Sequence, residues 1–289
     1  MSAAAKRRSG DAAAEARARL HREAELIRLG RVLGVEPAEL EFLEGADETA
    51  LRELRIMIAD HLYERAVAGL RNAAKLAGLL PGPISAKLSQ HALGPVLSAW
   101  TLPLLDPALV SSIGDRMPAT FLADTAVHLD LRRAAPVIGS IPEEKLRAAG
   151  AMLADREEYV VLAAFVGYLE LDVLDGLLEI FTSETLLQAA FLIEEPDRID
   201  ALVAHMPDDR IDDLHLAARR AGLWEQSLAL LASLGPEQQQ RFADSLARLD
   251  AEHHAVLGEQ LRADPTLLAI AQPLLARLDA GTRDAVGAS

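Results

Sequence analysis

Apolar residues recur at three- and four-residue intervals along most of the chain, which is the spacing of one helix face. In the first third this pattern predicts a helix over residues 11–33 that Gly34 ends, and a short helix that starts near Pro37 and ends at Gly45. A long helix is predicted from about Glu48 to Leu80, on the apolar positions Leu51, Leu54, Ile58, Leu62, Ala66 and Leu70. We therefore expect a helical hairpin or small bundle over residues 11–80.

Pro81, Gly82 and Pro83 form the strongest break in the first half, and a short phrase recurs beyond it. The phrase is an apolar residue, then proline, then small or acidic residues. Its copies read Met117-Pro118-Ala119-Thr120-Phe121, Ile141-Pro142-Glu143-Glu144-Lys145-Leu146, Met206-Pro207-Asp208-Asp209-Arg210-Ile211 and Leu234-Gly235-Pro236-Glu237-Gln238. Proline suits the first helical turn, where its missing N–H costs no hydrogen bond. Acids placed next stabilise the positive helix end, so each copy predicts a helix start.

The spacing of these helix starts predicts a repeat architecture. Pro207, Pro236 and Pro265 are 29 residues apart in each step, whereas the steps from Pro118 to Pro142 and from Ser183 to Pro207 are 24 residues. Such periods are typical of short helical repeats, although these are irregular. The expected fold is all-α: an N-terminal helical hairpin or bundle followed by an irregular α-solenoid, a right-handed superhelix. The expected regions are a flexible basic tail over 1–10, the N-terminal helical region over 11–80, the repeat region over 81–280 and a flexible tail over 281–289.

Two copies of the phrase, those at Pro142 and Pro207, resemble the short helical repeats in the cytosolic N-terminal domain of MgtE-type magnesium transporters. The resemblance covers at most residues 107–280. It implies a right-handed superhelix used for contacts. The transmembrane helices and regulatory domains of that family have no counterpart in this chain, so the resemblance does not imply transport.

Composition and charge restrict the classes of function. The chain of 289 residues is 51% hydrophobic but only 4% aromatic, and it contains no cysteine, which excludes disulfides, thiolate nucleophiles and cysteine-ligated zinc. The formal net charge of −15 opposes general attraction to nucleic acid or anionic lipid. Residues 1–31 nevertheless carry a local charge of +4, which we interpret as a solvated helix. The first eleven residues are polar and lack the apolar stretch of a secretory signal, so we expect a cytoplasmic protein.

Residues 88–105 form an uncharged stretch of 18 residues, the length at which a membrane span becomes conceivable. Polar residues, glycine and prolines interrupt it, so we expect a buried helix pair instead. An apolar ligand or a membrane surface is the alternative for this region. Its candidate contact residues are Leu88, Val96, Trp100 and Leu104.

The most suggestive polar cluster lies just after Pro207. Its members are Asp208, Asp209, Asp212, Asp213 and His215. Carboxylates three or four residues apart share a helix face and could hold Mg²⁺ or Mn²⁺. The alternative interpretation is helix-start electrostatics, because acids in a first turn already stabilise the helix, and we favour it.

Two other polar groupings have ordinary explanations. His253 and His254 are adjacent, so their side chains point about 100° apart, and we expect both to be solvated helix residues. His61 and Glu64 are one turn apart and could exchange a proton, but a surface ion pair has the same spacing. We identify no catalytic residue and no cofactor-binding motif.

The sequence therefore favours a non-enzymatic scaffold or adaptor that binds another protein, with homo-oligomer formation left open. The alternatives are a helical protein that binds an apolar ligand or a membrane through residues 80–110, and a regulatory domain that senses Mg²⁺ or Mn²⁺.

Overall fold

The computed structural model describes residues 3–190, 192–193 and 196–287, and within them every regular element is helical and no strand occurs. The all-α prediction is confirmed. The chain divides into two compact units. Unit 1 comprises residues 1–21 and 182–289, and unit 2 comprises residues 22–181.

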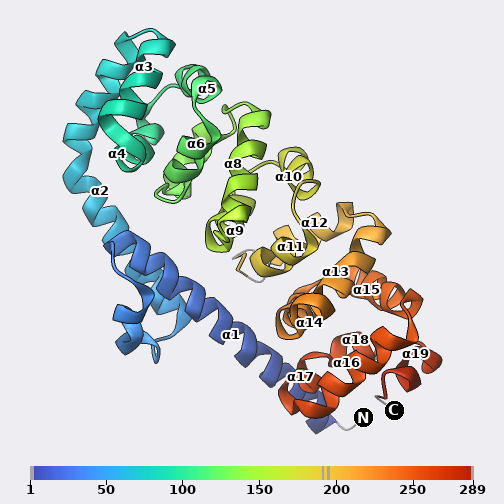
Figure 1. Ribbon diagram of the computed structural model, residues 1–289. Helices are drawn as coiled ribbons and strands as arrows, with labels where there is room; N and C mark the ends of the chain where they lie inside the picture. The colour runs from blue at the N-terminus through green and yellow to red at the C-terminus, as the bar shows by residue number, and fades with distance from the viewer. Residues whose placement is uncertain (1–2, 191, 194–195, 288–289) are drawn as a thin grey trace. The chain divides into compact units, whose positions relative to one another are not determined.

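Unit 2 begins within the first helix, α1, and continues through the long helix α2 into a series of short helices (Figure 1). The elements are α1 (Ala3–Leu33), η1 (Pro37–Leu43), α2 (Glu48–Leu79), α3 (Gly82–Leu88), η2 (Ser89–Leu93), α4 (Gly94–Thr101), η3 (Leu102–Leu104), α5 (Pro107–Arg116), α6 (Ala119–Ala126), α7 (Leu131–Ile138), α8 (Glu143–Asp155), α9 (Tyr159–Val166) and α10 (Leu171–Leu178). Helix α1 begins at Ala3, inside the stretch for which the sequence predicted a tail.

Unit 1 contains the remaining helices and the first part of α1. They are α11 (Ser183–Ala190), α12 (Pro196–His205), α13 (Asp208–Ala221), α14 (Trp224–Ser233), α15 (Pro236–Arg248), α16 (Ala251–Ala263), α17 (Pro265–Ile270), α18 (Gln272–Leu275) and α19 (Ala280–Ala285). Helix α19 extends into the stretch 281–289 that was also predicted to be a tail.

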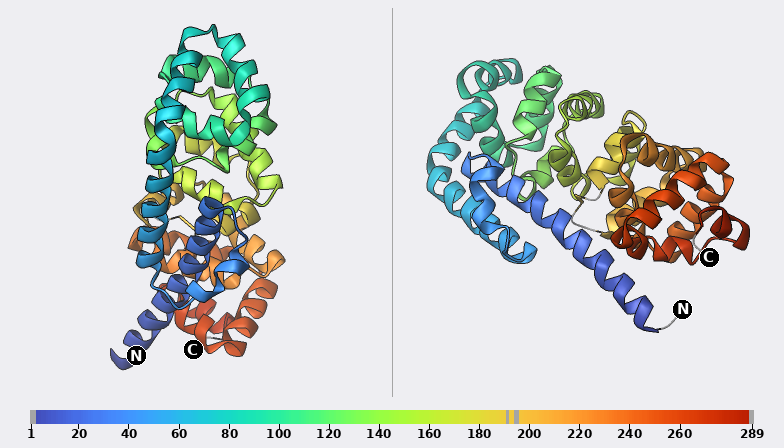
Figure 2. Two further views of the ribbon diagram at one scale, coloured as in Figure 1. Left: turned by 90° about the vertical axis from the view of Figure 1, so that its left-hand side faces the viewer. Right: turned by 60° about the horizontal axis from the view of Figure 1, so that its bottom comes forward.

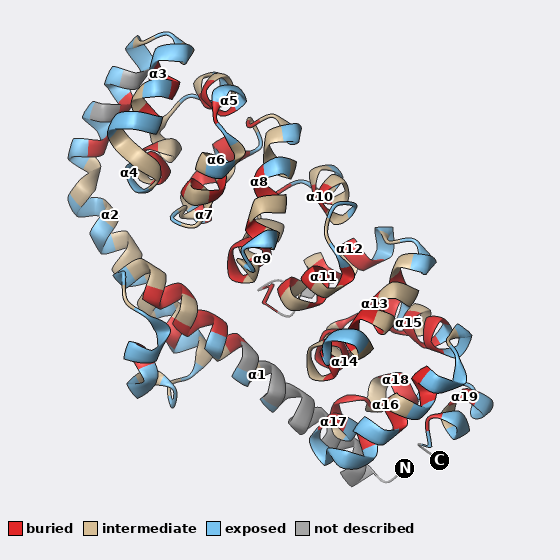
Figure 3. Ribbon diagram, viewed as in Figure 1, coloured by how far each residue is buried: buried red, intermediate tan, exposed pale blue. Residues whose placement is uncertain are grey.

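Many helices pack against the helix after next. In unit 2 one row runs α2, α4, α6, α8, α10 and another runs α3, α5, α7. In unit 1 a row runs α11, α13, α15, α18, while α14 packs on α17 and α16 on α19. Figure 2 shows the short helices of each unit lying side by side from two further directions. Buried residues gather where neighbouring helices face each other, and exposed ones gather at the turns (Figure 3).

The recurring proline phrase does begin helices. Pro118, Pro142 and Pro207 directly precede α6, α8 and α13, and Pro236 is the first residue of α15. Acids occupy the first turns of α8, α13 and α15, where the partial positive charge of the helix end favours them. The apolar residue before the proline is buried in three copies, at Met117, Ile141 and Leu234. All four copies therefore start a helix, and three of them also place an apolar side chain in the core.

Leucine and isoleucine form most of the core. In unit 2, Leu26 and Leu29 of α1, Leu40 of η1 and Leu51 of α2 form one cluster. In unit 1 the largest fully buried side chains include Phe242, Ile211, Leu231, Leu246 and Ile270. Gly222 ends α13 with φ +69°, a left-handed conformation that glycine adopts without the strain a Cβ would cause.

The expected buried helix pair over residues 88–105 is replaced by several shorter pieces. A π-helical turn ends at Gly94, whose φ of +70° redirects the chain into α4, and η3 follows. The polar residues and prolines of this stretch thus divide it. No helix in the described residues is long and apolar enough to cross a membrane.

Candidate functional site

The acidic cluster predicted from sequence lies on the first two turns of α13 in unit 1. Asp208 and Asp209 occupy the first turn, and Asp212 and Asp213 follow one turn later. Asp208 and Asp212 pair with side chains of α15, whereas Asp213 pairs with α11 and with arginines of its own helix. The Asp209 carboxylate accepts a hydrogen bond from the backbone N–H of Arg210, at 3.0 Å. The four carboxylates therefore have different partners and do not form one cluster.

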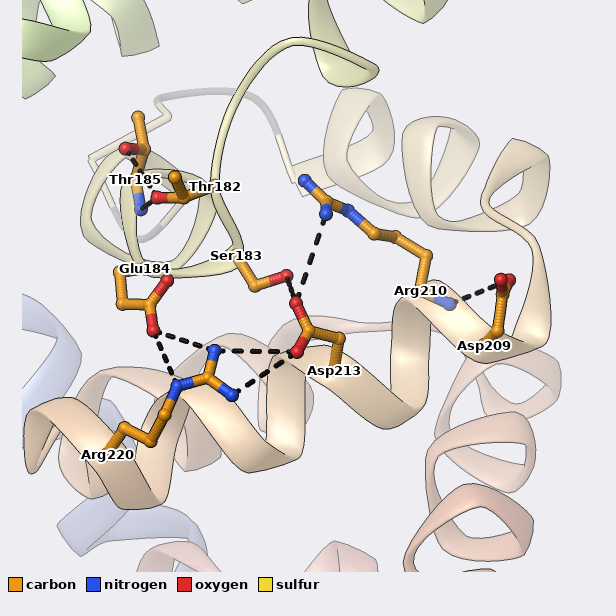
Figure 4. Close-up of polar contacts among 8 residues, drawn as sticks. All are labelled: Thr182, Ser183, Glu184, Thr185, Asp209, Arg210, Asp213 and Arg220. Carbon is orange, nitrogen blue, oxygen red and sulfur yellow. Dashed lines mark hydrogen bonds and ion pairs between the residues drawn. The ribbon is translucent and has the colours of Figure 1, made fainter.

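The α11 side is a small network of hydroxyl, carboxylate and guanidinium groups (Figure 4). Ser183 Oγ donates to Asp213 Oδ2 at 2.6 Å. The guanidinium of Arg220 donates to Glu184 Oε1 at 2.8 Å and 3.0 Å and to Asp213 Oδ1 at 3.4 Å. The Ser183 hydroxyl lowers the pKa of Asp213, and Arg220 lowers the pKa of Glu184. Both carboxylates are thus held in the ionised form by residues that join α11 to α13.

The α15 side is built around two arginines. Arg241 Nη2 donates to Asp208 Oδ1 at 2.8 Å and to the Met206 carbonyl at 2.6 Å, and its Nη1 donates to the Val203 carbonyl at 2.8 Å. One side chain of α15 therefore closes the α12–α13 turn. Asp212 Oδ1 accepts from Ser245 Oγ at 2.5 Å and from Arg248 at 2.6 Å.

This geometry favours helix-to-helix stabilisation over a metal centre. Among the residues that the structure describes, no group of three or more histidine, aspartate and glutamate side chains is arranged to hold a metal ion. Asp208, Asp212 and Asp213 are all paired with arginine, which already supplies the positive charge that a cation would bring. These hydrogen bonds and ion pairs hold α11, α13 and α15 together.

Two contacts from these acids to α15 share one sequence offset, whereas the Asp212–Arg248 contact spans 36 residues. Asp208 pairs with Arg241 and Asp212 with Ser245, and both pairs are separated by 33 residues. The phrase itself repeats after 29 residues at this point, so each contact lies one helical turn beyond the equivalent position of the next repeat. Sequence reasoning did not find the partners on α15. Placing the two repeats in register and adding one turn would have indicated them.

The prediction that His253 and His254 are solvated is wrong. His253 is 0% exposed, and His254 is also buried with its Nε2 bonded to the Leu246 carbonyl at 2.8 Å. The His253 ring lies edge to face with the rings of His215 and Trp224, at centroid distances of 6.2 Å and 5.5 Å. Neither ring nitrogen of His253 has a hydrogen-bond partner. These histidines belong to the core because α16 packs on α13, which the residues of α16 alone do not reveal.

His215, the histidine of the acidic cluster, points away from the carboxylates. Its Nε2 lies 3.1 Å from the Phe242 carbonyl, and the side chain is buried. Burial lowers the pKa of His215 to about 4, and burial together with the charge of Arg219 lowers the pKa of His253 to about 4. Both imidazoles are therefore neutral at pH 7.

Unit 2 holds a buried carboxylate that the sequence did not single out. Glu25 on α1 is almost fully buried and accepts from Arg28 at 2.6 Å and from Arg55 of α2 at 2.8 Å. Burial alone would raise the pKa of Glu25, but the hydrogen bonds and charges of these arginines hold it below its usual value. The spacing of Glu25 and Arg28 permits an ion pair within the helix, whereas the contact with Arg55 depends on how α1 and α2 pair.

The remaining candidates are dispersed. Of the four apolar contact residues, Val96 is exposed, while Leu88, Trp100 and Leu104 are half-buried on separate short elements. His61 and Glu64 are both exposed on α2. Their neighbour Asp60 instead pairs with Arg132 at 2.9 Å and with Arg133 at 2.6 Å, which fixes α2 to α7.

The fold and these contacts define an all-helical protein of short helices joined by side-chain pairs. Comparison with models of protein families, with curated proteins and with solved structures gave no match.

Proposed function

We propose that the protein is a non-enzymatic scaffold in which residues 81–280 form an irregular α-solenoid that binds another protein. The observation that carries the proposal is the contact of helices with the helix after next, in α3–α5–α7 and in α11–α13–α15. In repeat proteins each repeat contacts only the repeats next to it, and the stacked repeats form an extended surface that can bind a partner. The resemblance to the superhelical domain of MgtE-type transporters supports the same arrangement.

The side-chain pairs support this proposal independently. Within unit 1 the pairs Asp208–Arg241 and Arg219–Glu252 join residues 33 apart, and in unit 2 Arg156–Asp124 and Arg147–Glu179 join residues 32 apart. Each unit therefore uses charged pairs between successive repeats. The polar residues that the sequence offered as candidates for a metal site take part in this packing. We therefore propose that the surface of the protein carries its function.

The chemistry of that surface indicates the kind of partner. The formal net charge is −15, and residues outside the basic first 31 carry −19. A basic protein surface would be attracted to it, and the association rate would fall as salt rises.

The test begins with affinity purification from the native lysate, followed by binding of the repurified partner to the purified chain. We expect saturable binding of the partner at a fixed stoichiometry. The affinity is expected to fall between roughly 50 and 300 mM salt, because salt in this range screens the attraction between surface charges. Native mass spectrometry of the purified chain is the second arm. A small molecule retained at one per chain, without any protein that binds saturably, would contradict the scaffold proposal.

A further inference from the structure

The C-terminal half of α2, with α3 and α4, differs from the rest of the chain in charge. Residues 65–105 contain four lysines and arginines and no aspartate or glutamate, a charge of +4. The rest of the chain therefore carries −15 − 4 = −19. Arg71, Lys75 and Lys87 are exposed in this segment. A basic region on an acidic protein favours an anionic partner, and residues 65–105 differ from the basic residues 1–31 in carrying no acidic side chain at all.

On α3 and α4 the exposed side chains include large apolar ones and the buried ones are small, whereas Leu70 of α2 is buried. On α3 the buried residues are Ser85 and Ala86, while Ile84 is half exposed. On α4 the buried residues are Ser98, Ala99 and Thr101, while Val96 and Leu97 are exposed. This is the reverse of the usual preference, in which large apolar side chains are inside.

Helix α2 continues the pattern. Leu76 is 54% exposed and Leu79 is 82% exposed, and Lys75 lies one turn before Leu79. The exposed residues of the region therefore combine leucine, isoleucine and valine with lysine and arginine. Exposed apolar side chains that are grouped with basic ones indicate a contact surface.

We propose that this surface, formed by Arg71, Lys75, Leu76, Leu79, Ile84, Lys87, Val96 and Leu97, binds the headgroup region of an anionic phospholipid membrane. Basic side chains attract anionic lipid, and isolated leucine side chains enter the boundary between headgroups and acyl chains. A lipid surface fits better than a protein partner because projecting apolar side chains need no complementary pocket in a bilayer. The proposal goes beyond the scaffold function, since it concerns the basic end of unit 2 and a different partner.

The test is flotation of the purified full-length chain with vesicles of phosphatidylcholine alone and of phosphatidylcholine with 30% phosphatidylglycerol. We expect the chain to float with the anionic vesicles only, and less at 300 mM salt. The double variant Leu76→Ser, Leu79→Ser is expected to bind at least tenfold more weakly, roughly the loss of two partly buried leucines. Arg71→Gln, Lys75→Gln is expected to bind roughly 30-fold more weakly at low salt.

Phe42→Ser is the matched control, because Phe42 is 79% exposed on η1, outside the basic region, and its loss is expected to leave binding unchanged. Circular dichroism and thermal melting check that every variant is folded. Failure of the wild-type chain to float with anionic vesicles would overturn the proposal. Equal binding by the wild type and by the Leu76→Ser, Leu79→Ser variant would also overturn it. A dimer in solution that this variant disrupts, and that Phe42→Ser does not, would overturn it too and would assign the surface to a second copy of the chain.

Discussion

His253 makes the stability of unit 1 sensitive to acid. Its ring is buried against His215 of α13 and Trp224 of α14, and both ring nitrogens lack a partner. Electrostatic interactions with Arg219 and His254 disfavour protonation of His253, and the interaction with Asp250 favours it. Burial is the largest cause, and the pKa of His253 is lowered from 6.5 to about 4.

The sign of the effect follows from proton binding. Between pH 6.5 and pH 4 the unfolded chain binds a proton at His253 that the folded chain does not, so the free energy of unfolding falls as the pH falls through this window. Because the pKa of His253 is lowered from 6.5 to about 4, the free energy of unfolding is about 2 kcal/mol smaller at pH 5 than at pH 7.5. His215 has the same pKa of about 4 and contributes about 2 kcal/mol more. The carboxylates of Asp208 and Asp213 have pKa values below 3.8 and stay ionised at pH 5.

The perturbation is His253→Leu, a substitution of similar volume that removes the ring nitrogens. At pH 7.5 the variant is expected to be at least as stable as wild type, because an unpaired buried polar group is lost. Between pH 7.5 and pH 5 its free energy of unfolding is expected to fall by about 2 kcal/mol less than that of wild type. The control is His254→Leu, which loses the bond to the Leu246 carbonyl and is expected to cost about 1 kcal/mol at pH 7.5.

The assay is urea unfolding followed by tryptophan fluorescence. The chain has two tryptophans, and a Trp100→Phe background leaves Trp224 of unit 1 as the reporter. All variants are compared in that background at pH 7.5 and pH 5. An equal loss of stability in His253→Leu and in the parent would refute the reasoning.

Three further predictions concern packing and the acidic residues. Arg241→Ala is expected to destabilise unit 1 by roughly 2–3 kcal/mol in urea unfolding, because it leaves the Val203 and Met206 carbonyls and Asp208 without this donor. Arg248 is more exposed than Arg241 and bonds only a side chain, so Arg248→Ala should cost under about 1 kcal/mol. Equal costs would contradict this assignment. Gly258→Ala is expected to lower the melting temperature, because a Cβ there would overlap the Val286 carbonyl, while Gly139→Ala, where a Cβ meets nothing, should have little effect. Five millimolar Mg²⁺ or Mn²⁺ is expected to leave the melting temperature unchanged, since Asp208, Asp212 and Asp213 are paired with arginine; a rise that Asp212→Asn abolishes would restore the metal interpretation.

Local chemistry explains the part of the fold that was predictable from sequence. The long helix Glu48–Leu79 and the helix starts after Pro118, Pro142 and Pro207 follow from apolar periodicity and from proline and acids at helix starts. These signals lie within a few residues of the feature that they predict. Asp208 and Asp209 do lie in the first turn of α13, but the sequence did not indicate that Asp208 and Asp212 pair with arginines of α15.

The parts that sequence reasoning missed depend on contacts between distant residues. His253 and His254 lie in an ordinary amphipathic stretch, and only the packing of α16 on α13 buries them. Val96 and Leu97 lie on the outside of α4 because Ser98 and Thr101 take the inner positions, where the Thr101 hydroxyl bonds the Leu97 carbonyl at 2.9 Å. Apolar character alone predicted the opposite orientation.

We propose that residues 81–280 form an irregular α-solenoid, and small-angle X-ray scattering of the purified chain tests this proposal most directly. A compact globular chain of this length has a radius of gyration of about 19 Å. The account predicts a monomer with a clearly larger radius and an elongated pair-distance distribution. A monomer with a radius of about 19 Å and a symmetric distribution would contradict the claim.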